Sequence, residues 1–234
     1  MLNQAIVDKW LDAYRDRLLE AFGERLVFAG CQGSWARGEG RPDSDIDAVA
    51  VLDRIESEDL VTYRDIINGL PHPDHACGIF WSVDELRHHE PRCEVVHHWY
   101  GIRVLHGSMD GKVEPPTDAD LIAEIRLRMG NSIHAARHYL LFPHDIAGKV
   151  HNLHSEFKYA PVTLRWWLLL TTGVYHAKTA NLVAALTEPL DKEVARIALE
   201  WEDLAEDRSA RLRYYIELLE RWARDMLERL PKDR

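Results

Sequence analysis

The sequence predicts an α/β domain with a mixed sheet, followed by an all-α helical bundle. Up to about residue 113, short apolar runs rich in β-branched residues alternate with stretches of helical period. Pro115 and Pro116 then interrupt both patterns. Beyond them, apolar residues recur at steps of three and four, without another strand-like run. We therefore expect two domains, 1–113 and 117–234.

Composition narrows the class of protein. The 234 residues are ample for a hydrophobic core, and the formal net charge of −10 argues against bulk binding to nucleic acid, which needs a positive face. No apolar run is long enough to span a bilayer, and the first ten residues lack the apolar centre of a signal peptide. Three widely spaced cysteines fit neither a metal site nor a disulfide framework. We therefore expect a cytoplasmic protein with no membrane partner.

The element order follows from periodicity and from helix-ending residues. A helix over 3–22 should lead into a strand at 26, and Pro143, Pro161 and Pro189 should separate the C-terminal helices. In the first domain we expect strands at 26–29, 46–52, 76–81, 93–96 and 102–107, and further helices at 57–70 and 83–89. In the second we expect one helix from about 122 to 140, then helices at 146–159, 162–170, 181–186, 192–204 and 212–230.

The segment from Leu26 to Leu52 carries the chemistry. Gly33 and Ser34 follow its first strand and predict a tight turn into a short helix. Backbone N–H groups at such a turn, with the N-terminus of the helix, form a concavity that binds anions. We therefore expect this turn to hold a phosphate group.

Two carboxylates stand where the second strand begins. Asp45 and Asp47 are two positions apart, so along a strand they project from one face. Two such carboxylates repel each other unless a cation lies between them, and Mg²⁺ binds through one or two carboxylates plus phosphate oxygens. A metal beside a phosphate cradle serves phosphoryl or nucleotidyl transfer. The alternative, two solvated aspartates at a surface turn, leaves the Gly-Ser pair unexplained.

Gly33-Ser34 followed by Asp45-Ile46-Asp47 resembles the Gly-Ser…Asp-x-Asp signature of the DNA polymerase β-like nucleotidyltransferase superfamily. The order of elements resembles its small bacterial two-domain members, including the aminoglycoside nucleotidyltransferases. The resemblance implies a nucleoside triphosphate substrate and two Mg²⁺ ions held by Asp45 and Asp47. The nucleotide-binding positions that it implies in the first domain are Gly33, Ser34, Arg37 and Ser44.

Members of this superfamily usually carry a third carboxylate on a neighbouring strand, where it completes the metal site or acts as a base. The run Cys93-Glu94-Val95-Val96 is the strand candidate that would supply it, which makes Glu94 the expected third catalytic and metal-binding residue. Glu90 is a weaker candidate. A charged residue on an edge strand is the alternative interpretation of Glu94.

The helical half contributes two further candidates. In two-domain members the helical domain supplies basic side chains to the nucleotide, so Lys158 or Lys178 would neutralise the triphosphate. A lysine whose stem lies along an apolar helix is the alternative for each. Arg128 and His134 also have the Arg-x₅-His spacing of helical RNases that accompany small nucleotidyltransferases.

The expected function is Mg²⁺-dependent transfer of a nucleoside monophosphate to a hydroxyl group of a small molecule, such as an antibiotic, or of a protein. The alternatives are a catalytically inactive nucleotide- or partner-binding protein of the same fold, and an antitoxin or RNase-type module. A homodimer could form through the bundle or the N-terminal helix, but the sequence does not determine the oligomeric state.

Overall fold

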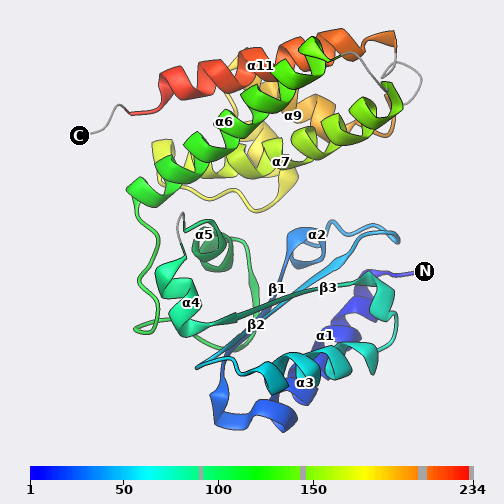
Figure 1. The fold of residues 1–234 in the computed structure, drawn as a ribbon, viewed down its shortest axis with the longest axis vertical. Helices are drawn as coiled ribbons and strands as arrows, with labels where there is room; N and C mark the ends of the chain where they lie inside the picture. The colour runs from blue at the N-terminus through cyan, green and yellow to red at the C-terminus, as the bar shows by residue number, and fades with distance from the viewer. Residues whose placement is uncertain (90–91, 143–145, 205–209, 232–234) are drawn as a thin grey trace. The chain divides into compact units, whose positions relative to one another are not determined.

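The computed structural model describes residues 1–89, 92–142, 146–204 and 210–231 (Figure 1). The chain divides into two compact units, Met1–Pro116 and Thr117–Arg234. The first is an α/β unit with a mixed sheet and the second is helical, which confirms the predicted fold class. None of the helices in the described ranges combines the length and apolar character needed to cross a membrane.

The sheet of the first unit has the strand order β3-β2-β1-β4. Its strands are β1 (Leu26–Gln32), β2 (Ile46–Leu52), β3 (Ala76–Ser82) and β4 (Arg103–Gly107). β1 pairs antiparallel with both β2 and β4, whereas β2 and β3 are parallel. A parallel pair needs a crossover connection, and a helix between β2 and β3 supplies it.

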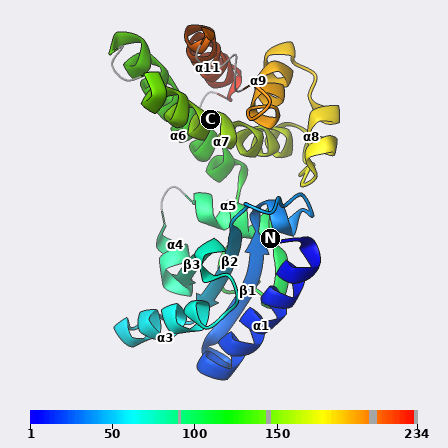
Figure 2. The ribbon, with the colours of Figure 1, turned by 90° about the vertical axis from the view of Figure 1, so that its right-hand side faces the viewer.

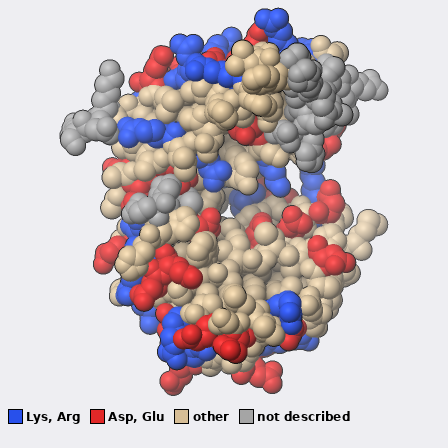
Figure 3. Space-filling model, viewed as in Figure 1, with Lys and Arg blue, Asp and Glu red and all other residues tan. Residues whose placement is uncertain are grey.

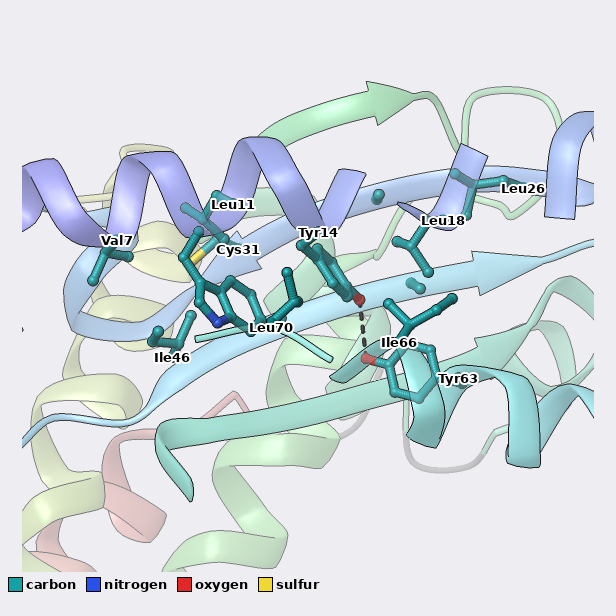
Figure 4. Close-up of a cluster of buried hydrophobic side chains, with 14 of the residues drawn as sticks. Val7, Leu11, Tyr14, Leu18, Leu26, Cys31, Ile46, Tyr63, Ile66 and Leu70 are labelled. Carbon is teal, nitrogen blue, oxygen red and sulfur yellow. Dashed lines mark hydrogen bonds between the residues drawn. The ribbon is translucent and has the colours of Figure 1, made fainter. Parts of the chain in front are cut away.

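Helices cover both faces of this sheet (Figure 2). The elements are α1 (Gln4–Phe22), η1 (Gly23–Arg25), α2 (Gly33–Ala36), α3 (Ser57–Asn68), η2 (Pro73–His75), α4 (Val83–His88) and α5 (Cys93–Tyr100). α1 and α3 pack on one face in a large apolar cluster, where the hydroxyl groups of Tyr14 and Tyr63 lie 2.9 Å apart (Figure 4). On the opposite face, Leu86 of α4 and Val95 of α5 pack in a second cluster with the valines of β2.

The second unit consists of helices packed against one another. Its elements are α6 (Asp118–Leu141), α7 (Ile146–Thr172), α8 (Thr179–Ala185), α9 (Pro189–Leu199) and α11 (Leu212–Arg229). α11 packs along α6, and α7 contacts both α6 and α9. Within each unit, basic and acidic side chains are interspersed on the face that Figure 3 shows.

The prediction of two separate helices around Pro161 was wrong, because α7 continues through this proline. A proline inside a helix removes one backbone hydrogen bond and normally ends the helix. Here Phe157, Ala160 and Leu164 are all buried at helical spacing on both sides of it. This packing outweighs the local preference, since tertiary contacts routinely override propensity.

The predicted strand at 93–96 is also wrong, because these residues begin helix α5. The two adjacent valines, Val95 and Val96, form a short β-branched run of the kind that is typical of a buried strand. Val95 and Trp99 are four positions apart, however, and both pack in the apolar cluster on the sheet. Four residues is the spacing of one helical face, so packing selects the helix.

Candidate active site

The structure brings the Gly-Ser turn and one carboxylate of the Asp pair together. β1 ends at Gln32, which pairs with Asp47 across the antiparallel ladder. Gly33 follows with a φ of +73°, and a Cβ atom placed on it would lie 1.8 Å from the Asp47 Oδ2 atom. Only glycine leaves room for the carboxylate at this backbone conformation. The Asp47 side chain therefore lies directly on the turn where we expect a phosphate.

Asp45 and Asp47 differ in their surroundings. Asp45 precedes β2 and is exposed, whereas Asp47 lies within the strand and is half-buried. Both offer hard oxygen ligands, which suit Mg²⁺ completed by water and substrate oxygens. In the part of the chain that the structure describes, no three His, Cys, Asp or Glu side chains are grouped closely enough to hold a metal ion. Metal binding by Asp45 and Asp47 stays a prediction.

The loop between α2 and β2 is held by hydrogen bonds. The Trp35 indole Nε1 donates to the Ser44 carbonyl oxygen at 3.3 Å, and the Arg41 backbone N–H donates to the Ser44 hydroxyl at 2.9 Å. Arg37 forms an ion pair with Glu39 at 3.0 Å. Ser44 therefore shapes the loop that leads to Asp45. Nucleotide binding by Ser34, Arg37 and Ser44 stays a prediction.

β3 departs from the pattern that the resemblance implies. It neighbours β2, and Cys77 is the register partner of Asp47. The sequence of β3 is ACGIFWS, which contains no carboxylate. A third carboxylate therefore does not come from β3, the strand that pairs in parallel with β2.

Glu94, expected on a strand, lies in the first turn of α5 instead. Its Oε2 atom is 3.8 Å from the Nε2 atom of His98, one turn further along the helix. His98 Nδ1 in turn lies 3.2 Å from the Gln32 Oε1 atom. The buried His98 imidazole thus lies between the Glu94 carboxylate and the Gln32 carboxamide at the end of β1. Glu90, the weaker candidate, lies outside the described residues.

The electrostatic environment keeps His98 neutral. Burial lowers its pKa to about 3, and His97 adds a smaller effect in the same direction. A neutral imidazole has one N–H donor and one lone pair, so it can donate to one neighbour and accept from another. Sequence reasoning missed both His98 and Gln32, because nothing distinguishes His98 among thirteen histidines.

The two lysine candidates in the helical unit have exposed side chains. Lys158 lies on α7 and Lys178 is the N-cap residue of α8, and neither side chain is buried. Their contribution to triphosphate binding stays a prediction.

The Arg-x₅-His pattern does not form one helical face. The Arg128 guanidinium lies 4.5 Å from the centre of the Tyr159 ring, and Glu124 Oε2 is 3.7 Å from Arg128 Nε. His134 lies further along α6, where it contacts His138. Six positions on a helix correspond to a rotation of about 240°. The two side chains therefore project in different directions, contrary to what an RNase site on one face requires.

Comparison with known proteins concerns the fold of the chain. No protein-family model matches the chain, and no curated protein sequence does either. A solved structure does match: spectinomycin adenyltransferase AAD(9) from Enterococcus faecialis with ATP and spectinomycin. The match covers 93% of this chain and 99% of that one, with a TM-score of 0.57 and 12% sequence identity. The chain therefore shares the fold of this adenyltransferase structure. This shared fold confirms the predicted resemblance at the level of fold, whereas the roles of individual residues stay predictions.

Replacing Gly33 by alanine should lower nucleotidyl transfer about a hundredfold or more, because a displacement of about 1 Å at a reacting group has an effect of that size. The new methyl group would force the Asp47 carboxylate away from the turn. The matched control is Gly111→Ala, since Gly111 has a φ of +69° and open space around it. Both variants should lose similar stability in thermal unfolding. Equal activities in the two variants would contradict the placement of Asp47.

Proposed function

We propose that the protein transfers a nucleoside monophosphate from a nucleoside triphosphate to an acceptor hydroxyl group and releases pyrophosphate. The observation that carries the proposal is the contact between the Asp47 carboxylate and the Gly33 backbone at the end of β1. This contact supports a site in which a carboxylate lies beside backbone N–H groups of a kind that binds phosphate. The nucleotidyltransferase fold supports the same reaction class.

In this proposal, Gly33 and Ser34 bind the β- and γ-phosphates, and Asp45 and Asp47 hold Mg²⁺. When bound, Mg²⁺ would offset the negative charge of the phosphates. The acceptor oxygen forms a bond to the α-phosphorus while the bond to the bridging oxygen breaks. Pyrophosphate leaves with that electron pair, and the hydroxyl proton passes to a base. Glu94 is the candidate base.

The acceptor is proposed to be a small hydroxylated molecule. The solved structure with the same fold contains ATP and spectinomycin, so a nucleotide and a small antibiotic occupy that protein together. A hydroxyl group on a protein is the other acceptor class to screen. The net charge of −10 is compatible with a cationic acceptor.

A calorimetric titration tests the nucleotide site. Each nucleoside triphosphate is titrated with Mg²⁺ into the wild type and into the Asp45→Asn/Asp47→Asn double variant. We expect metal-dependent binding that weakens about a hundredfold in the double variant, because both charged ligands are lost. Binding of equal strength in both proteins, with and without Mg²⁺, would contradict the proposed metal site. Pyrophosphate release over an acceptor panel then tests the transfer.

A further inference from the structure

His98 links two parts of the first unit that the proposed reaction uses. Its ring lies between the Gln32 carboxamide at the end of β1 and the Glu94 carboxylate on α5. The His98 side chain has no exposed surface. Gln32 stands directly before Gly33 and pairs with Asp47. The imidazole is therefore hydrogen-bonded to the strand that carries the expected phosphate-binding turn, and its other nitrogen faces the candidate base.

The hydrogen-bonding chemistry gives the two ring nitrogens different roles. The atom that lies 3.2 Å from Nδ1 is the Gln32 carbonyl oxygen, which can only accept, so we assign the ring proton to Nδ1. The Nε2 atom then carries a lone pair, and it has no hydrogen-bond partner among the described residues. A buried acceptor of this kind is unfavourable until a donor reaches it. The Glu94 Oε2 atom, 3.8 Å away, is close enough to become that donor after a small movement and a change of protonation.

We infer that His98 is a positioning residue that accepts a hydrogen bond from Glu94 once Glu94 has taken the acceptor proton. This inference rests on the proposed function. The proton leaves the acceptor hydroxyl and forms an O–H bond on the Glu94 carboxylate, and that O–H group donates to His98 Nε2. His98 itself keeps its Nδ1 proton throughout. The contact is stronger after proton transfer than before it, which is the condition for accelerating the chemical step.

His98→Asn is the variant that separates the two contacts. An asparagine amide can replace Nδ1 as the donor to Gln32, but it offers nothing at the position of Nε2. We expect kcat to fall about tenfold to a hundredfold, with KM for the nucleotide and the melting temperature nearly unchanged. The matched control is His97→Asn, on the neighbouring position of α5, which should keep full activity. An unchanged kcat in His98→Asn would overturn the inference.

A double-variant cycle shows whether His98 acts through Glu94. Glu94→Gln should lower kcat, and adding His98→Asn should lower it no further, because the hydrogen bond is already lost. Losses that multiply would mean that His98 acts independently of Glu94. If the wild type transfers no nucleotide to any acceptor, the proposed function fails. If it transfers normally and only the cycle fails, the inference about His98 alone is wrong.

Nitrogen-15 spectra of the histidine side chains test the geometry without turnover. We expect His98 to be neutral with its proton on Nδ1, and we expect Glu94→Gln to shift its Nε2 resonance. A proton on Nε2, or an Nε2 resonance that Glu94→Gln leaves unchanged, would overturn the inference.

Discussion

Asp47→Asn is expected to lower nucleotidyl transfer at least about a thousandfold, equivalent to about 4 kcal/mol of transition-state stabilisation. The Asp47 carboxylate lies on the Gly33 backbone, where it can face both a metal ion and a phosphate. Asparagine keeps the shape of the side chain but removes the charge that would attract the proposed Mg²⁺. Single-turnover transfer of labelled nucleotide measures the effect, and thermal unfolding should show a melting temperature close to that of the wild type.

Asp43→Asn is the control for this prediction. Asp43 is an exposed aspartate in the loop that precedes β2, four positions before Asp47. The two variants change the net charge equally, so a difference between them reports on position and not on total charge. Similar rates in both variants would contradict the role of Asp47.

The sequence was sufficient to predict that the Gly-Ser turn and Asp47 lie together, because local patterns determine this proximity. Gly33 and Asp47 are separated by one short helix and a loop, and antiparallel pairing of the strands on either side brings them together. Strong β-branched character at 46–52 made the second strand recognisable. The paired acids and the Gly-Ser turn were then interpreted together, as a metal site beside a phosphate-binding turn.

The parts that sequence reasoning missed depend on packing between distant segments. α5 is a helix because Val95 and Trp99 meet the sheet on one face, a fact that no window of local sequence contains. His98 contacts Gln32 across 66 positions in the chain. Such contacts become visible only when the fold has placed both residues, which is why Glu94 was assigned to the wrong type of element.

Asp191→Ala is expected to destabilise the helical unit by about 3 kcal/mol, the effect of breaking a buried ion pair from one side. Asp191 is buried in the first turn of α9. It accepts hydrogen bonds from the Trp222 indole at 2.9 Å and from both terminal nitrogens of Arg229, at 2.9 and 2.8 Å. The Arg229 guanidinium also lies 4.9 Å from the centre of the Trp167 ring. One carboxylate therefore connects α9 with α11, while its arginine partner contacts α7.

Asp225→Ala is the matched control, because Asp225 pairs with the same arginine at 2.8 Å while 44% of its side chain is exposed. An exposed pair contributes only about 0.5 kcal/mol, since water and salt screen it. Thermal unfolding should therefore show a fall of about 6–12 °C for Asp191→Ala and of about 1–2 °C for Asp225→Ala. Equal shifts would mean that burial does not decide the strength of these pairs. A large shift for Asp191→Ala alone would identify this carboxylate as the contact that holds α9 against α11.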